Sequence, residues 1–379
     1  MKQLISMLSV YNNQLSISGM SRRMALSVCL LFMMTVTISA QRKYQTLDRG
    51  VVACNNGIAS SSPVFISWRL LAQDPETVRF NLYCNKGGTG DYILLNTDGP
   101  LTNTNFSTTL AAVPTNSLLC VAPVVNGVEF AKSVPFRFIQ RAYRSIFMDI
   151  TYDGFLSNTD YSTKFIWPAD LDGDGEYDFV VDRLSLKGST HKVEGYLRTG
   201  ERLWTIDMGP NVRISEGHND MVVAYDMNCD GKAEVVIKSS DGTRFWDKGN
   251  NTWGKYLKDA PNGDTDNDGI VDYTTQSVRV PPQYITVVDG LTGAELSTVE
   301  MPYPHDAYNN YTRDSKANYM GDDYSNLNGH MGIAYLDGVH PSVVMEYMCR
   351  AVSEFHFYYV SAWGYKFVNG KATDWELKY

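Results

Sequence analysis

The sequence is poor in cysteine, has no apolar run long enough to span a membrane comfortably, and carries fewer basic than acidic residues. Beyond a predicted leader, the cysteines are Cys54, Cys84, Cys120, Cys229 and Cys349, and this odd number at wide spacing matches no metal-binding motif. A disulfide bridge among the first three stays open on sequence grounds. Few long periodic apolar runs and 24 tyrosines favour β structure.

Residues 1–40 have the order of a signal peptide. Arg22 and Arg23 precede an apolar run over residues 25–38, which ends in small residues. That run has 14 residues, too few to cross a bilayer comfortably. We therefore predict a secreted or periplasmic protein without stable membrane insertion, in which residues 1–19 are an over-called translation start.

The acidic balance restricts the partners. The formal net charge is −9, and removal of the three positive charges of the leader changes it from −9 to −12. Such a chain is a poor nucleic-acid binder, because the phosphates repel it. It would also repel an acidic polysaccharide unless cations or a local basic patch mediate the contact.

An acidic pattern of nine residues occurs three times. Residues 170–178, 226–234 and 264–272 each have oxygen-bearing side chains at positions one, three, five and nine and a glycine at position six. This spacing lets a short loop fold around a hard cation such as Ca²⁺, which takes about six to eight oxygen ligands. Position twelve is never the glutamate of an EF-hand, so the pattern predicts calcium loops of another kind, at the entry to β-strands.

The residues assigned to these three sites are Asp170, Asp172, Asp174, Glu176 and Asp178, then Asp226, Asn228, Asp230, Lys232 and Glu234, and finally Asp264, Asp266, Asp268, Ile270 and Asp272. For any single copy the alternative is a merely solvated acidic turn. The threefold repetition argues against that alternative, and Ca²⁺ is the expected cofactor.

The rest of the chain predicts an all-β protein in two parts. Over residues 41–140, short alternating strands separated by turn signals predict a β-sandwich domain. Over residues 141–379, three long units each read as a four-stranded meander, which is the pattern of a propeller blade. Because three blades cannot close a ring, we expect a partial calcium-binding propeller and a truncated version of a longer protein.

A combination of motifs resembles a known family. The motifs include residues 47–53, 64–75, 238–243 and 332–338 together with the first two acidic loops. Over nearly all of residues 44–379 the chain closely resembles the rhamnogalacturonan lyases of polysaccharide lyase family eleven. The resemblance implies a fibronectin-like sandwich followed by an eight-bladed, calcium-rich propeller, of which this chain would hold about three blades.

The same resemblance implies an activity and a partner. The pectic polysaccharide rhamnogalacturonan I would be cleaved between rhamnose and galacturonate by β-elimination. In such lyases the base is a Lys or an Arg, and the best candidates lie in later blades that are absent here, so we assign no catalytic residue and leave open whether the chain is an enzyme. The alternative is a non-catalytic, calcium-dependent propeller for glycan binding or adhesion.

Three residues near the loop strands, Arg183, His218 and Lys238, are candidates for substrate binding. The last two stand where the family pattern also has His and Lys. Each has a structural alternative: Arg183 could pair with a loop carboxylate, His218 could be a satisfied hydrogen-bonding residue, and Lys238 could be a blade-edge charge. The aromatic segment 244–260 is equally open, since its rings could stack on sugars or cover a neighbouring blade.

Overall fold

The computed structural model describes residues 42–142, 160–186, 190–212, 221–247, 251–257, 264–272, 283–301, 328–350 and 356–379. Within these ranges the regular structure is β-strand apart from one short 3-10 turn, η1 (Lys86–Gly88), so the all-β prediction is confirmed. None of the described helical structure is long and apolar enough to cross a membrane. The predicted signal peptide lies outside the described residues.

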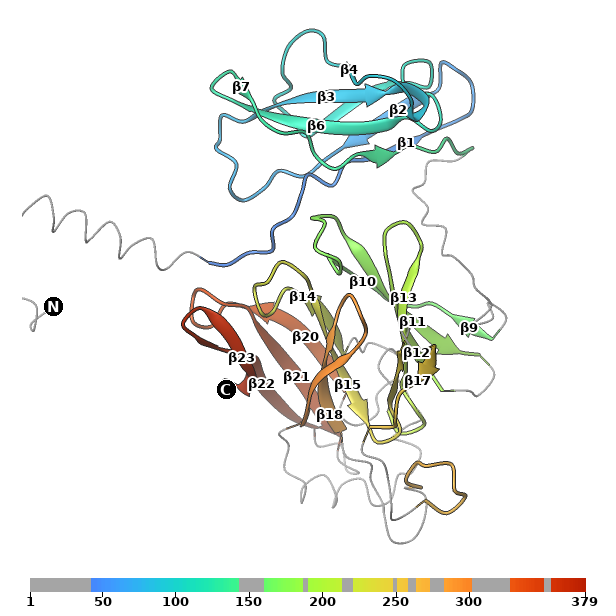
Figure 1. Cartoon of the computed structure of the whole chain (residues 1–379), viewed down its shortest axis with the longest axis vertical. Helices are drawn as coiled ribbons and strands as arrows, with labels where there is room; N and C mark the ends of the chain where they lie inside the picture. Colours follow the sequence, from blue (N-terminus) through green and yellow to red (C-terminus); the bar gives the residue numbers. More distant parts are fainter. Residues whose placement is uncertain are drawn as a thin grey trace, which may run out of the picture. The chain divides into compact units, whose positions relative to one another are not determined.

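The N-terminal region consists of two antiparallel sheets around one core (Figure 1). The first sheet has the order β1 (Val52–Asn55), β2 (Pro63–Ser67), β5 (Asn105–Thr109). The second has the order β4 (Ile93–Leu94), β3 (Arg79–Asn85), β6 (Leu118–Val125), β7 (Val128–Glu129), and β8 (Phe136–Arg137) also pairs with β6. Alternate residues of β2 and β3 are buried, as expected for strands with one face on a core.

The cysteines of this region form no bridge. Cys54, Cys84 and Cys120 are free, as is Cys229. Cys84 pairs with Leu119 across β3 and β6, one register position away from Cys120. Because neighbouring positions of a strand point to opposite faces, Cys84 and Cys120 lie on opposite sides of the sheet. The bridge that the sequence left open is therefore not formed.

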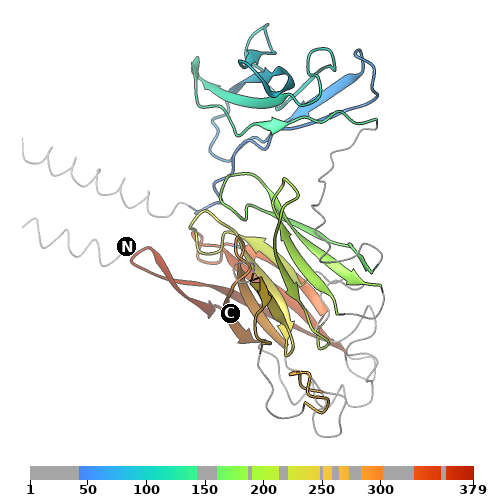
Figure 2. The same ribbon diagram turned by 45° about the vertical axis from the view of Figure 1, so that its right-hand side comes forward.

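Three four-stranded antiparallel units follow, each in simple meander order (Figures 1 and 2). The first unit is β10 (Ile166–Ala169), β11 (Asp178–Ser185), β12 (Lys192–Tyr196), β13 (Arg202–Asp207). Its sheet continues beyond β13 with β16 (Arg244–Asp247) and β17 (Thr252–Trp253), and β9 (Tyr161–Ser162) also pairs with β11. The second is β14 (Val222–Tyr225), β15 (Glu234–Ser240), β18 (Gln283–Asp289), β19 (Glu295–Glu300). The third is β20 (Asn328–Ala334), β21 (Ser342–Arg350), β22 (His356–Val368), β23 (Lys371–Leu377).

The second unit packs on both of its faces. Val235 and Ile237 of β15 join the core shared with the first unit, whereas Val236 joins the core shared with the third. This division follows from the strand period of two, which turns successive side chains to opposite faces. The first strands of the three units are neighbours as well, since β14 contacts both β10 and β20.

Among the described residues, Arg42 and Lys43 group with Tyr335–His340 in a contact unit of their own. The Lys43 N–H donates to the Val339 carbonyl at 2.9 Å, and the Tyr335 hydroxyl donates to the Lys43 carbonyl at 2.8 Å. Residues 335–341 connect β20 to β21, and in the third unit they take the place of the acidic loop that precedes β11 and β15.

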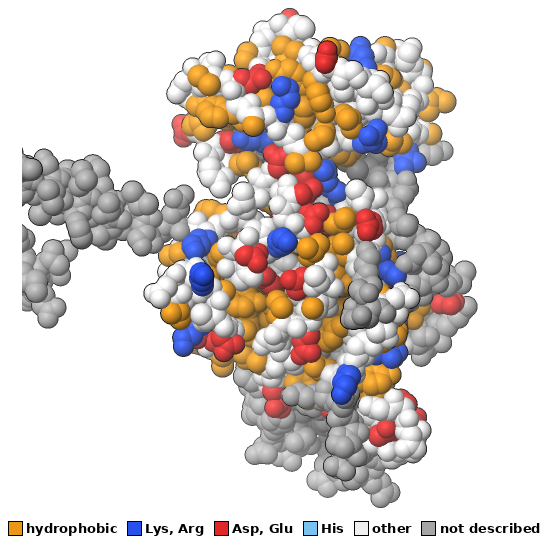
Figure 3. Space-filling model, viewed as in Figure 1, with side chains coloured by type: hydrophobic (Ala, Val, Ile, Leu, Met, Phe, Trp, Pro, Cys, Tyr) orange, Lys and Arg blue, Asp and Glu red, His pale blue; other side chains and the backbone are white. Residues whose placement is uncertain are grey.

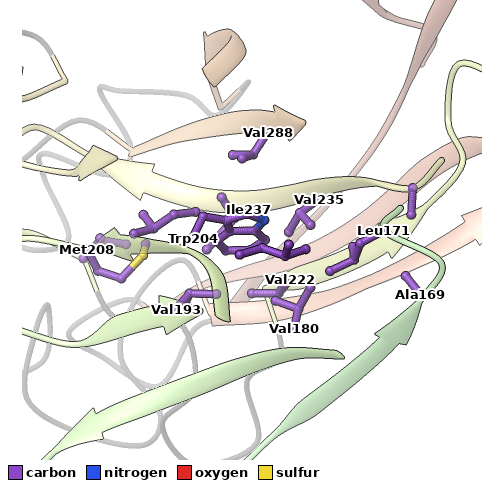
Figure 4. Packing of buried hydrophobic residues seen from close by; sticks show 14 residues of the cluster. Ala169, Leu171, Val180, Val193, Trp204, Met208, Val222, Val235, Ile237 and Val288 are labelled. Carbon is purple, nitrogen blue, oxygen red and sulfur yellow. The ribbon is translucent and has the colours of Figure 1, made fainter. Parts of the chain in front are cut away.

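Trp204 of β13 occupies the middle of the core between the first two units (Figure 4). Its side chain is fully buried, and its indole N–H donates to the Gly290 carbonyl at 2.7 Å. The opposite residue on β12 is Gly195, where a Cβ atom would come within 2.3 Å of the indole ring. Glycine is required here because the ring fills the space that any side chain would need.

We therefore predict that Gly195→Ala destabilises the protein by about 1 to 3 kcal/mol or more, the usual cost of overpacking a core. Urea unfolding of the variant would measure the change. Gly332→Ala is the matched control, because a methyl group at that strand glycine meets no atom of the described residues within 4 Å. Equal effects of the two substitutions would contradict this account of the core.

Candidate functional site

The first acidic loop, residues 170–178, folds its side chains inward onto its own backbone. One carboxylate oxygen of Asp170 accepts the Gly173 N–H and the other the Gly175 N–H, each at 2.8 Å. Oxygen atoms of Asp170, Asp172 and Asp178 all lie within 4.8 Å of one another. Several carboxylates held this close, with oxygens to spare, form a donor set that suits a hard divalent cation.

Burial makes this loop unfavourable as a bare anion cluster. Asp170 and Asp178 are each 2% exposed. Desolvation raises the pKa of Asp170 above its ordinary range and raises the pKa of Asp178 to about 7. A bound cation would remove this penalty, so the local electrostatics agree with the donor geometry.

In the second loop, residues 226–234, two acidic side chains bind the side-chain amide of Asn228. The Asn228 side chain donates to Glu234 at 2.6 Å and to Asp230 at 3.1 Å. Burial raises the pKa of Asp226 to about 6 and that of Glu234 to about 8. Cys229, at a variable position, adopts a left-handed φ of 63°.

The third loop, residues 264–272, differs in exposure. Oxygen atoms of Asp264, Asp266 and Asp268 also lie within 4.8 Å of one another, but the last two are exposed. The backbone hydrogen bond from Gly269 is the main cause of a lowered pKa at Asp264. Ionisation of these exposed carboxylates costs little free energy. The stability of this loop therefore depends less on a bound cation than that of the two buried loops.

Position seven of the loops contributes no carboxylate to the clusters. The Glu176 side chain accepts the Gly50 N–H at 2.8 Å and lies 3.4 Å from the Arg69 guanidinium. Lys232 and Ile270 hold the same position in the other loops. Lys232 and Ile270 have no side-chain oxygen, so only a main-chain oxygen could bind a cation at those two positions. Assignment of all three residues as ligands stays a prediction.

The first two loops are stacked on each other. The Ala233 N–H donates to the Asp170 carbonyl at 2.7 Å, and the Lys232 side chain lies beside Gly173. Leu171 and Ala233, one from each loop, are fully buried in the core shared by the first two units. The loops therefore form one end of that pair of sheets.

The candidate substrate residues lie toward the other end. Because β11 and β15 start at the stacked loops and run away from them, Arg183 and Lys238 come near the opposite end of adjacent sheets. Both are buried, at 6% and 3% exposure. Arg183 lies 3.6 Å from Glu194 of β12, not beside a loop acid, and burial lowers the pKa of Lys238 to about 7. His218 lies outside the described residues, and substrate contact by any of the three stays a prediction.

Sequence reasoning missed a row of charges at this end, which we call the charged ladder. Arg183, Lys192, Asp207 and Arg244 stand in register across β11, β12, β13 and β16. Directly opposite residues share one face of a sheet, with Cβ atoms about 4.5 to 5.5 Å apart. Lys192 and Arg244 thus flank the Asp207 carboxylate, and Arg183 lies beside Glu194, in a chain whose net charge is −9. On the face that Figure 3 shows, basic and acidic side chains are interspersed.

Two family models match the chain. The model of the C-terminal domain of rhamnogalacturonan lyase family 11 matches residues 144–375, which is more than half of the sequence. The chain belongs to rhamnogalacturonan lyase family 11. The model of the β-sheet domain of rhamnogalacturonan I lyases matches residues 42–138. The resemblance drawn from the motifs is confirmed.

Curated relatives of this family 11 chain include both modes of cleavage. Rhamnogalacturonan endolyase YesW of Bacillus subtilis is 29% identical over 348 residues, which cover 86% of this chain and 50% of YesW. Rhamnogalacturonan exolyase YesX of the same organism is 31% identical over 323 residues, which cover 80% of this chain and 46% of YesX. The family 11 chain spans about half the length of the curated relatives it matches.

Solved structures agree with these sequence matches. A rhamnogalacturonan lyase PL11 of Bacillus licheniformis has a TM-score of 0.63 to this chain at 28% identity, covering 89% of this chain and 53% of its own. The exotype rhamnogalacturonan lyase YesX has a TM-score of 0.62 at 27% identity, covering 89% and 51%. The all-β architecture of the family 11 chain is thus that of known lyases over about half their length.

The buried loop acids predict how stability of the family 11 chain varies with pH. Because the pKa values of Asp178, Asp226 and Glu234 are raised to about 7, 6 and 8, the metal-free folded protein binds more protons than the unfolded chain. Its stability should therefore fall as the pH rises from about 5 to about 8. Melting temperatures in a chelator at both pH values would measure the effect. A chelated protein that melts higher at the higher pH would contradict it.

Proposed function

We propose that this chain acts on rhamnogalacturonan, a pectic polysaccharide, as a lyase. The observation that carries the proposal is that two lyase family models match consecutive parts of the chain and together span residues 42–375 almost without a gap. The curated relatives are named as rhamnogalacturonan lyases over the same region. No observation favours the alternative of a non-catalytic binding protein.

The proposed architecture is a fibronectin-like sandwich followed by successive blades of a β-propeller. Each C-terminal unit is a four-stranded antiparallel meander, which is how a blade is built. The packing of the second unit on both neighbours and the adjacency of the first strands β10, β14 and β20 support a radial arrangement. The eight blades implied by the family remain part of this proposal.

The proposed cofactor is Ca²⁺, held by the acidic loops. Oxygen donors alone, in short turns with several carboxylates, are the ligand set that calcium prefers. Asp170, Asp172 and Asp178 would hold it in the first loop, and Asp226, Asn228, Asp230 and Glu234 would do so in the second. With the first two loops stacked at one end of the sheets, these ions would stabilise the fold rather than meet substrate.

The proposed reaction is β-elimination at galacturonate. Neutralisation of the carboxylate by a cation or a basic side chain acidifies the C5 proton, a base removes that proton, and the bond from C4 to the leaving oxygen breaks. A double bond forms between C4 and C5, and the departing oxygen takes up a proton. No described residue is assigned as the base, although the lowered pKa of Lys238, about 7, suits proton transfer near neutral pH.

The direct test is to incubate the purified chain with rhamnogalacturonan and Ca²⁺. We expect the ultraviolet absorbance of the conjugated, unsaturated uronide to rise with time, because elimination creates that chromophore and hydrolysis does not. Polygalacturonate is the control polymer, since it keeps the galacturonate carboxylates and lacks the rhamnose that alternates with galacturonate in the proposed substrate. A flat trace from protein that circular dichroism shows to be folded would count against lyase activity.

Metal removal tests the cofactor separately from the reaction. A chelator should lower the melting temperature, because a ligand at about 100 times its dissociation constant stabilises the folded state by about 2.7 kcal/mol. Asp170→Asn should remove much of the calcium-dependent shift, since that acid is buried among the loop donors. Asp264→Asn, in the exposed third loop, is the matched comparison and should have a smaller effect. A melting temperature indifferent to both chelator and Ca²⁺ would rule out structural calcium.

A further inference from the structure

Arg244, at the outer end of the charged ladder, holds hydrogen-bond donors that nothing in the described residues uses. A guanidinium carries five N–H donors. Its contacts there are the Asp207 carboxylate at 3.6 Å and the rings of Trp253 and Tyr256, whose centroids lie 4.7 and 4.8 Å from Cζ. Nε is its one nitrogen that is both buried and unpartnered, and the side chain as a whole keeps 27% exposure. The side chain is therefore partly open to solvent.

The two rings fix the orientation of the guanidinium. Trp253 lies on β17, and Trp246 packs edge-on against it at 5.3 Å. Leu257, next to Tyr256, donates its N–H to the Thr243 carbonyl at 2.6 Å. A cation over an aromatic face is attracted to it, so the contacts with Trp253 and Tyr256 together restrain the guanidinium. Trp253 and Tyr256 thus contact an arginine, a role that the sequence did not suggest, whereas Phe245 of the same segment packs against the core shared by the first two units.

Asp207 cannot neutralise this arginine fully, because its single negative charge is shared with Lys192; its shorter contacts gather on Oδ1, whereas Arg244 faces Oδ2. Thr190 donates to the Asp207 carboxylate at 2.6 Å, Lys192 lies 2.8 Å from it, and the Gly209 N–H donates at 3.1 Å. Arg244, at 3.6 Å, is beyond a good hydrogen bond. One carboxylate between two cations leaves a net positive charge at the exposed end of the row.

We propose that Arg244 binds the carboxylate of a uronic acid, making Arg244, Trp253 and Tyr256 a binding site for acidic saccharide apart from the acidic loops. The planar fork of a guanidinium matches a carboxylate with two parallel hydrogen bonds, and preorganisation by Trp253 and Tyr256 reduces the entropy lost on binding. The choice of a uronate over other carboxylates rests on the proposed function. This site offers the acidic polymer an attractive point on an otherwise repulsive, acidic chain.

The test is binding of trigalacturonate to the whole chain, measured by calorimetry, beside Arg244→Gln, which keeps a planar group between the rings. We expect the substitution to weaken binding about ten- to hundredfold, the range for a charge-assisted hydrogen bond. Arg244→Lys, which keeps the charge and loses the fork, should fall between the two. Arg79→Ala on β3, far along the chain from this site, is the control and should bind as the wild type does.

Methyl-esterified trigalacturonate separates charge recognition from packing. Its affinity should be the same for wild type and Arg244→Gln, because no carboxylate is present. The inference would be overturned if Arg244→Gln lost equal affinity for the acid and the ester, or lost affinity for neither. It would also be overturned if the wild type did not bind trigalacturonate. Lyase activity is scored independently: Arg244-dependent binding without an unsaturated product would refute only the proposed function, and product formation with unchanged Arg244→Gln binding would refute only the inference.

Discussion

The stacking of two acidic loops where the first and second sheets meet is the constraint on which the rest of the structure depends. A backbone hydrogen bond joins the loops: the Ala233 N–H donates to the Asp170 carbonyl at 2.7 Å. Leu171 of the first loop packs in the core shared by the two sheets. The same contact buries carboxylates, which water no longer solvates. Stability and cation binding are therefore coupled, because the packing that aligns the sheets also creates the charge that a cation must neutralise.

That alignment separates the two ends of the sheets by chemistry. At the loop end, acidic side chains fold onto their own backbone, and the nearest guanidinium groups are those of Arg69, 3.4 Å from Glu176, and Arg198, 3.6 Å from Asp174. At the far end, strand register brings Lys192 and Arg244 to either side of Asp207. Antiparallel pairing produces both results, since it returns each chain to the level at which the previous strand began. The basic row is a consequence of register and not of any local motif.

This difference explains what the sequence could and could not predict. The acidic loops were readable because their donors are close in sequence and glycine marks the turns, as at Gly175 and Gly231, where φ is positive. The charged ladder was not, because Asp207 and Arg244 are paired only by strands whose register depends on the fold. Glu176 is a different case: its spacing resembles that of a ligand, and its carboxylate also accepts the Gly50 N–H, a partner that the loop's own sequence does not supply. Local spacing predicts loops, whereas partners supplied by distant strands need the structure.

The charge distribution bears on how an acidic chain could hold an acidic polymer. At a net charge of −9, long-range electrostatics oppose the encounter, but they are screened over roughly 8 Å at physiological ionic strength. Inside that distance individual groups decide, and the exposed end of the charged ladder is locally positive. Cations bound in the loops would reduce the repulsion between the chain and the polymer. They would not create a specific contact with the polymer, because the ion already occupies the oxygen ligands of the loop. Specific recognition of a carboxylate must then come from basic side chains that have hydrogen-bond donors to spare. Among the described residues Arg244 meets that condition, because it lies 3.6 Å from Asp207, beyond a good hydrogen bond, and shares that carboxylate with Lys192.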